Sequence, residues 1–200
     1  MRIVGVLLAA GRGSRFGGDK LRAPLVHPAP DIPVGTPVGI ASAIHVGQAL
    51  AEVVAVLRPG HADLAAGIRA AGLETIECAN ADEGMGATLS CGVSAAQDAD
   101  GWVVALADMP WIMPATIAMV AAALAAGADI VAPVYRGKRG HPVGFARRHR
   151  DELIASCGDA GARELIAANR DALTLLDVDD PGVLRDVDVP DDLAPLPSLP

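Results

Sequence analysis

The first twenty residues join an uninterrupted apolar run to a loop rich in glycine and basic side chains. Residues 3–10 read Ile-Val-Gly-Val-Leu-Leu-Ala-Ala, and residues 11–20 contain four glycines, two arginines and a lysine. The apolar run predicts a buried strand. Glycines let the backbone approach an anion, and the basic side chains stand out in a chain whose net charge is −8. This segment therefore predicts a buried strand that ends in a phosphate-binding loop.

Two common phosphate-binding motifs do not fit this loop. The Walker sequence requires serine or threonine after its lysine, whereas Leu21 follows Lys20 here. The dinucleotide fingerprint requires a third glycine where this chain has Phe16, and about twenty residues further on a proline-rich stretch replaces the ribose-binding strand end. The loop therefore argues against a P-loop NTPase and against a nicotinamide or flavin enzyme.

Strand-like and helix-like patterns alternate along the rest of the chain. Strands are predicted at residues 52–57, 73–77, 102–107 and 129–134, and helices at 37–50, 61–71, 85–97 and 114–126. This alternation is typical of an α/β domain with a mostly parallel twisted sheet and helices on both faces. We place a single domain at residues 1–193 and a flexible Pro-rich tail at 194–200. The proline-rich segment 24–37 is an excursion beyond the loop and a candidate lid.

The composition argues against several classes of protein. Net negative charge and only five Trp, Phe and Tyr residues argue against a nucleic-acid partner. The longest uncharged stretch, residues 109–128, is interrupted by prolines and a glycine, so we expect no membrane span. The N-terminus lacks the pattern of a secretory signal peptide. Cys78, Cys91 and Cys157 are far apart in sequence, which predicts reduced thiols in a cytoplasmic protein.

Residues 8–20, L-A-A-G-R-G-S-R-F-G-G-D-K, resemble the signature of the molybdenum cofactor cytidylyltransferase and guanylyltransferase family. The resemblance extends from residue 3 to residue 193 and is weakest at 27–37. It implies a Rossmann-like nucleotidyltransferase fold in which the loop holds the nucleotide triphosphate. Arg15 and Lys20 are implied to act as catalytic cations. The implied nucleotide-binding residues in this segment are Leu8, Ala9, Ala10, Gly11, Gly13 and Lys20.

Two acidic segments are candidate metal ligands. Asp108 follows the predicted strand 102–107, at the sheet edge where parallel sheets present functional groups, although a helix cap is an equally open reading of the residues alone. Asp186 and Asp188 alternate, so they face the same side of an extended strand, and a solvent-facing acidic turn is the alternative. The resemblance implies that Asp108 and Asp188 hold a catalytic Mg²⁺. The family usually has threonine where this chain has Val189.

Three further segments match the family. Gly84 and Met85 open a helix rich in small residues and are implied to contact the nucleotide, but the family's usual serines are replaced by Gly86 and Thr88. The acceptor is implied to bind at Gly140, His141 and Pro142, where we assign His141 positioning rather than proton transfer. Residues 158–163 match another family segment, whose own pattern indicates only a turn and a helix start.

The resemblance implies an enzyme that transfers CMP from CTP to the terminal phosphate of the molybdenum-pterin cofactor and releases pyrophosphate. The sequence Ala9-Ala10-Gly11 favours the cytidine branch over the guanosine branch, and GTP remains open as the nucleotide. Two different functions also stay open: nucleotidyl transfer to another phosphorylated acceptor, and non-catalytic carriage of the cofactor. The presence of both Asp108 and Asp188 favours the enzyme. A recipient molybdoenzyme is a further candidate partner.

Overall fold

The computed structural model describes residues 1–159 and 161–194, so most of the predicted tail lies outside the described residues. The helices are α1 (Val38–Ala49), α2 (Ala62–Ala70), α3 (Met85–Ala95), α4 (Pro114–Ala125), α5 (Arg150–Ile154) and α6 (Arg163–Ala168). The strands are β1 (Ile3–Ala9), β2 (Val53–Leu57), β3 (Glu74–Glu77), β4 (Gly101–Leu106), β5 (Ile130–Tyr135), β6 (Lys138–Arg139), β7 (Val143–Ala146) and β8 (Leu173–Asp177). The alternation up to β5 confirms the predicted α/β class.

The strands form one mixed sheet in the order β3-β2-β1-β4-β7-β5-β6, with β8 pairing to β5. β1 pairs in parallel with both β2 and β4, and β2 pairs in parallel with β3. β5 and β8 are also parallel, whereas β7 runs antiparallel between β4 and β5. The reversal begins at Arg136 and Gly137, whose φ angles of 49° and 76° suit a tight hairpin between β5 and β6. The mostly parallel sheet is confirmed, and the antiparallel insertion is an addition to the prediction.

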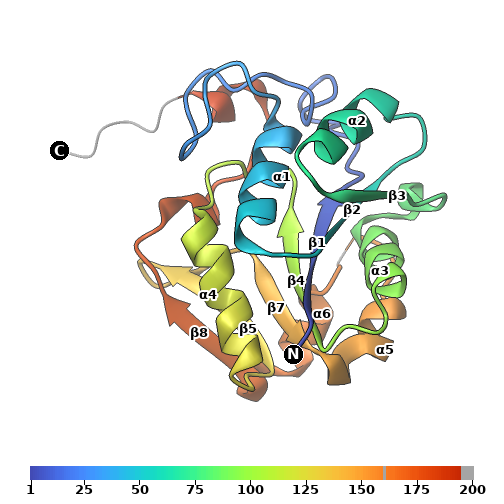
Figure 1. Cartoon of the computed structure of the whole chain (residues 1–200), viewed down its shortest axis with the longest axis vertical. Coiled ribbons are helices and arrows are strands. Elements are labelled where there is room, and N and C mark those ends of the chain that lie inside the picture. The colour runs from blue at the N-terminus through green and yellow to red at the C-terminus, as the bar shows by residue number, and fades with distance from the viewer. Residues whose placement is uncertain (160, 195–200) are drawn as a thin grey trace.

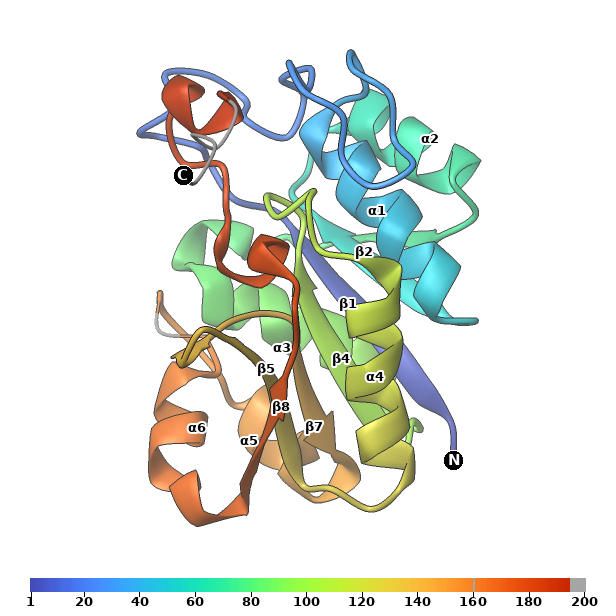
Figure 2. The ribbon, with the colours of Figure 1, turned by 90° about the vertical axis from the view of Figure 1, so that its left-hand side faces the viewer.

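Helices cover both faces of the sheet, as predicted. Figure 2 shows α1, α2 and α4 on one side of the strands and α3, α5 and α6 on the other. Successive residues of β1 serve these two layers in turn: Leu7 packs in the core beneath α1 and α4, and Val6 and Leu8 pack in the core beneath α3. This double burial explains why β1 is apolar throughout. Figure 1 shows β1 and β4 side by side at the centre of the fold.

The proline-rich segment 24–37 packs against α1. Its ends are joined by a bridge between Pro24 and Pro37, and the Nε2 atom of His45 in α1 lies 2.6 Å from the carbonyl oxygen of Pro30. Leu25 is buried in the core beneath α1. None of the segment's residues lines the cavity at the carboxyl edge of the sheet, and the role of a lid stays a prediction.

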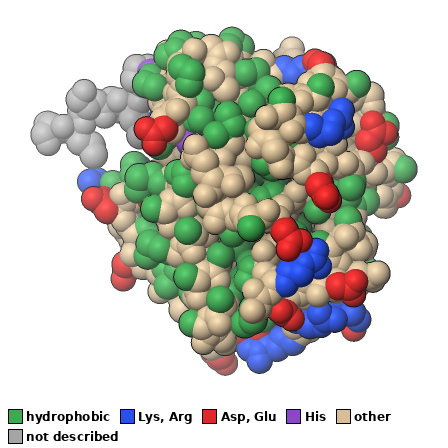
Figure 3. All heavy atoms as spheres, in the orientation of Figure 1, with side chains coloured by type: hydrophobic (Ala, Val, Ile, Leu, Met, Phe, Trp, Pro, Cys, Tyr) green, Lys and Arg blue, Asp and Glu red, His purple; other side chains and the backbone are tan. Residues whose placement is uncertain are grey.

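The uncharged stretch at 109–128 contains α4, which packs on the sheet through Ile117, Val120 and Leu124. Figure 3 shows the molecular face that includes α4, where hydrophobic and uncharged side chains predominate. Over residues 1–159 and 161–194, every helix falls short of the length and apolarity needed to cross a bilayer.

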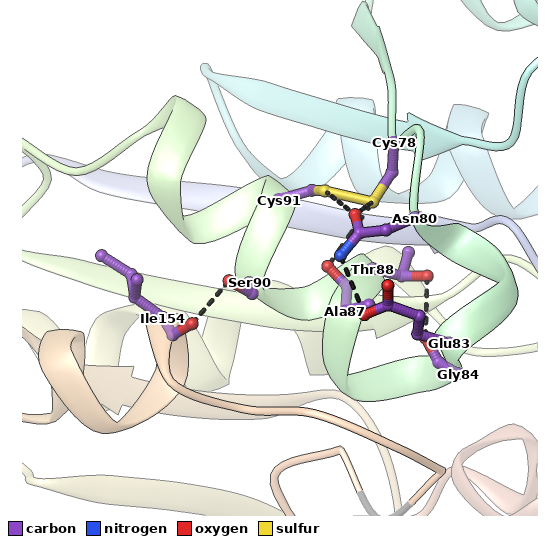
Figure 4. The surroundings of a disulfide bond; sticks show 9 residues. All are labelled: Cys78, Asn80, Glu83, Gly84, Ala87, Thr88, Ser90, Cys91 and Ile154. Atoms are coloured by element: carbon purple, nitrogen blue, oxygen red, sulfur yellow. Dashed lines mark hydrogen bonds between the residues drawn. A yellow bond between two sulfur atoms is a disulfide. The ribbon is translucent and has the colours of Figure 1, made fainter.

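The prediction of reduced thiols is wrong for two of the three cysteines. Cys78, just after β3, and Cys91, in α3, are joined by a disulfide, with their Cα atoms 6.0 Å apart (Figure 4). They are 13 positions apart in sequence, but the chain folds back between them, and that fold brings the two side chains together. Cys157 is a free, exposed thiol, as predicted.

Candidate active site

A cavity of about 920 Å³ opens at the carboxyl ends of β1 and β4, the edge at which parallel sheets bind ligands. The predicted residues that line it are Leu8, Ala10, Gly11, Gly13, Arg15, Lys20, Gly84, Met85, Asp108, Gly140, His141 and Asp188. Ala9 and Pro142 do not line it. Ala9 faces the core on the other side of the sheet because strand residues alternate, and Pro142 is buried directly before β7.

The glycine-rich loop after β1 forms one wall of this cavity. Gly13 has a φ of 61°, and a Cβ atom there would lie 2.7 Å from the carbonyl oxygen of Gly18, so this turn excludes any side chain. Arg12 and Arg58 both pair with Asp82, which lies in the turn before α3. This ion-pair group connects the loop to the opposite wall and was not predicted, because nothing in the local pattern relates the three positions.

Lys20 and Arg15 contact the predicted metal ligands directly. The buried Nζ atom of Lys20 lies 2.7 Å from Oδ2 of Asp108 and 2.9 Å from Oδ1 of Asp188, and Arg15 lies 2.9 Å from Oδ2 of Asp188. Burial opposes the charge on Lys20, but the two carboxylates together raise its pKa. The hydrogen bond from Lys20 in turn lowers the pKa of Asp188, against the opposing effect of burial. The cations and carboxylates therefore neutralise one another.

The carboxylates of Asp108, Asp186 and Asp188 form a group that fits a divalent cation. One oxygen from each lies within 4.8 Å of the others. Oδ1 of Asp108 is buried and has no hydrogen-bond partner within the described ranges, which leaves a lone pair available for a metal. Carboxylate oxygens are the ligands that Mg²⁺ and similar hard cations prefer. Burial, reinforced by Asp108 and Asp188, raises the pKa of Asp186, which the sequence placed on one face with Asp188 but which the resemblance did not name as a ligand.

The segment that carries Asp186 and Asp188 is extended but is not a strand, in contrast to the prediction. Its position is set by a backbone hydrogen bond in which the amide of Val187 donates to the carbonyl oxygen of Asp108 over 2.9 Å. The carboxylate of Asp192 accepts hydrogen bonds from the amides of Asp188 and Val189, each 2.8 Å long. These contacts explain how residues distant in sequence reach one candidate metal-binding position.

Asp180 anchors the start of this segment and was missed by the sequence reasoning. Its buried carboxylate accepts hydrogen bonds from the amide of Met113 (2.9 Å), the hydroxyl of Thr116 (2.7 Å) and the amide of Gly182 (2.9 Å). It thereby ties the beginning of α4 to the turn that leads to the acidic residues. An aspartate before Pro-Gly is a turn signal, but its partners in α4 are not visible in the sequence.

Two of the predicted acceptor residues, Gly140 and His141, lie on the cavity wall formed by β6 and the residues after it. The amide of His141 donates to the carbonyl oxygen of Val183 over 3.0 Å, which fixes the backbone there. Arg139 and Gly140 line the cavity beside His141, as does Arg163 at the start of α6. Burial lowers the pKa of His141, and the positive charges of Arg139 and Arg163 lower it further, whereas Asp108 opposes them.

The start of α3 forms the remaining wall. A Cβ atom on Gly86 would lie 2.5 Å from the backbone of Cys157, so the serine usual in the family has no room here. The hydroxyl of Thr88 donates to the carbonyl oxygen of Gly84, one turn earlier in the same helix (Figure 4). Both departures from the family pattern therefore serve the packing of α3. Met85 is about half exposed at the cavity mouth.

A glycine-rich loop after the first strand, facing a group of carboxylates across the carboxyl edge of the sheet, defines a nucleotidyltransferase. The chain belongs to the family of MobA-like NTP transferase domains, which matches residues 5–173. It is 29% identical to the purine catabolism protein PucB of Bacillus subtilis strain 168 over 205 residues, covering 95% of this chain and 93% of PucB. These findings confirm the predicted enzyme class and the resemblance.

Solved structures of a Mycobacterium tuberculosis H37Rv protein, Rv0371c, share the fold. One is 30% identical with a TM-score of 0.76 and covers 96% of this chain and 95% of its own. Another, a complex with manganese, is 29% identical with a TM-score of 0.71 and covers 96% of each chain. The manganese complex and the acidic group of this chain are both consistent with a divalent cation in this family.

Proposed function

We propose that this nucleotidyltransferase transfers CMP from CTP to the terminal phosphate of the molybdenum-pterin cofactor, with Mg²⁺, and releases pyrophosphate. The observation that carries the proposal is the contact of Lys20 with Asp108 and Asp188 at the end of the glycine-rich loop. This contact joins the glycine-rich loop, which would bind the triphosphate, to the carboxylates, which would bind the cation. The Ala9-Ala10-Gly11 sequence supports CTP, and the resemblance of the whole chain supports the pterin acceptor.

The glycine-rich loop and the basic residues Arg15 and Lys20 act on the nucleotide. Backbone amides around Gly11 and Gly13 bind the β- and γ-phosphates, and Lys20 and Arg15 exchange their carboxylate partners for phosphate oxygens. Asp108, Asp188 and Asp186 would hold Mg²⁺, which supplies neutralisation of the charge that develops on the transferred phosphate. The released pyrophosphate remains bound to the same loop cations, which stabilise it as a leaving group.

The acceptor phosphate is the nucleophile. One of its oxygens attacks the α-phosphorus of CTP, a new P–O bond forms, and the bond from the α-phosphorus to the bridging oxygen breaks, with its electron pair leaving on pyrophosphate. The acceptor phosphate is already ionised at neutral pH, so no side chain has to remove a proton. The lowered pKa of His141 favours a neutral ring, which agrees with a positioning role. Catalysis then depends on alignment and charge neutralisation.

The test is pyrophosphate release from CTP, GTP, ATP and UTP in turn, with Mg²⁺ and with or without molybdenum cofactor. Release from CTP only in the presence of the cofactor is the expected result. Release from GTP alone would reassign the nucleotide. Release with a different phosphorylated acceptor would reassign the acceptor. Binding of the cofactor without turnover of any nucleotide would favour a carrier.

A further inference from the structure

The basic side chains that line the cavity divide into two kinds. Arg12, Arg15 and Lys20 are each paired with a carboxylate. Arg139 and Arg163 also line the cavity, but they make no ion pair or side-chain hydrogen bond with any residue that the structure describes. Both residues are exposed and line the cavity, so their guanidinium groups are available to an anionic ligand there.

Both arginines are carried by backbone that is fixed to other parts of the site. Arg139 directly precedes Gly140, whose amide donates to the carbonyl oxygen of Pro133 over 2.8 Å. Arg163 is the first residue of α6, and earlier in the chain the carbonyl oxygen of Gly158 accepts a 2.7 Å hydrogen bond from the amide of Gly86 in α3. A fixed backbone lowers the entropy that the side chains lose on binding a ligand.

His141 lines the same cavity as the two arginines and is two positions from Arg139 in the sequence. Both lower the pKa of His141, and the carboxylate of Asp108 acts on the same ring in the opposite sense. The Nδ1 atom of His141 is buried and has no hydrogen-bond partner among residues 1–159 and 161–194. The cavity that the arginines line therefore also contains an unsatisfied polar atom, and the candidate metal ligand Asp108 lines the same cavity.

We propose that Arg139 and Arg163, together with His141, form a second anion site that binds the phosphomonoester group of the acceptor, separate from the glycine-rich loop. Two guanidinium groups match the charge and the oxygen geometry of a phosphate dianion. A neutral imidazole adds one hydrogen bond without adding charge. Residues 158–163 match the family but have no other evident role. The proposed site gives this segment a function in acceptor binding. The identity of the acceptor rests on the proposed function, whereas the phosphate chemistry rests on the arginines.

The experiment measures binding of inorganic phosphate by calorimetry in the presence of saturating CTP and Mg²⁺, without acceptor. The double variant Arg139→Gln/Arg163→Gln is compared with Lys138→Gln/Arg170→Gln, which removes the same charge from exposed residues that do not line the cavity. We expect the first variant to bind phosphate at least about tenfold more weakly, and the control to match the wild type. Equal affinity in all three proteins, or an equal loss in both variants, would overturn the site.

A kinetic measurement separates this proposal from the proposed function. In the first variant the KM for the acceptor is expected to rise at least about tenfold while the KM for CTP stays unchanged. If the molybdenum cofactor is not an acceptor at all, the proposed function fails, but the phosphate titration still decides the anion site. If transfer to the cofactor occurs and the acceptor KM is unaffected, the anion site fails alone.

Discussion

The two sides of the cavity use positive charge in opposite ways. On the loop side, Lys20 and Arg15 are already neutralised by Asp108 and Asp188. On the arginine side, defined by Arg139, His141 and Arg163, the described residues provide no compensating carboxylate in contact. A ligand on the loop side has to exchange partners with the protein, whereas a ligand on the arginine side only has to supply negative charge.

Under the proposed function, this difference makes the binding of nucleotide and the binding of metal depend on each other. A cation that approaches Asp108 and Asp188 competes with Lys20, and triphosphate oxygens offer Lys20 new partners. Binding of either ligand therefore makes binding of the other more favourable. The arginine side has no such exchange and can bind its ligand independently. Substitutions on the two sides should therefore have different effects on metal, nucleotide and phosphate binding.

The largest effect is expected from Asp108→Asn. Loss of one metal-binding carboxylate should lower turnover by roughly 10³-fold or more, because charge neutralisation at the α-phosphorus depends on the bound cation. Pyrophosphate release measures it, and circular dichroism checks that the fold is intact. Asp171→Asn, at an exposed residue outside the cavity and outside the acidic group, is the control. Full activity of Asp108→Asn with Mg²⁺ would remove Asp108 from the mechanism.

Lys20→Gln is expected to strengthen metal binding and to lower turnover. Without the Lys20 ammonium group between the carboxylates, the nucleotide-free protein should bind Mn²⁺ about tenfold more tightly, while turnover falls by roughly 10²-fold. Titration of Mn²⁺ followed by electron paramagnetic resonance measures the affinity. Arg22→Gln, which breaks an ion pair outside the cavity, serves for comparison. Weaker Mn²⁺ binding in Lys20→Gln would show that Lys20 orients the carboxylates and does not compete.

Asp180→Ala is expected to lower the free energy of unfolding by about 2–4 kcal/mol. The substitution leaves the amides of Met113 and Gly182 and the hydroxyl of Thr116 without their acceptor in a buried position. Urea denaturation measures the loss, and Asp179→Ala, at an exposed neighbour, provides the matched control. Mn²⁺ affinity should fall as well, because the anchor of the acidic segment is lost. An unchanged metal affinity would mean that Val187 and Asp192 suffice to position it.

The smallest effect concerns stability as a function of pH. The folded-state pKa of His141 is lowered below 6.5 by burial and by Arg139 and Arg163, with Asp108 opposing. Below that pH the unfolded chain takes up a proton that the folded protein does not, so the free energy of unfolding falls as the pH drops. The slope is at most about 1.4 kcal/mol per pH unit. His141→Gln should remove this slope, and Arg139→Gln/Arg163→Gln should reduce it.

Urea denaturation between about pH 7.5 and 5.5 measures both variants. An unchanged slope in His141→Gln would show that other groups carry the pH dependence. An unchanged slope in the arginine variant alone would show that burial, and not the arginine side, sets the protonation of His141.

The sequence predicted the elements from β1 to β5 because each combines a long apolar or periodic pattern with a turn signal. β6, β7 and β8 were not predicted, since they are short strands whose pairing depends on the hairpin at Arg136 and Gly137. The loop and Asp108 were predicted from where they follow strands, whereas Asp188 was predicted as a metal ligand only through the family resemblance. Contacts such as Asp180 with Thr116, and the Cys78–Cys91 disulfide, depend on how distant segments pack, which local patterns do not record.

Lys20 and Asp188 are 168 positions apart, and their contact has a consequence for protein synthesis. A polypeptide interrupted by a premature stop codon before residue 188 would carry the whole glycine-rich loop but lack the second carboxylate that balances Lys20. Such a product would have a buried, half-compensated ammonium group and no complete cation site. We expect incomplete translation products to be inert toward nucleotide and metal, so that catalytic competence reports that translation has passed residue 188.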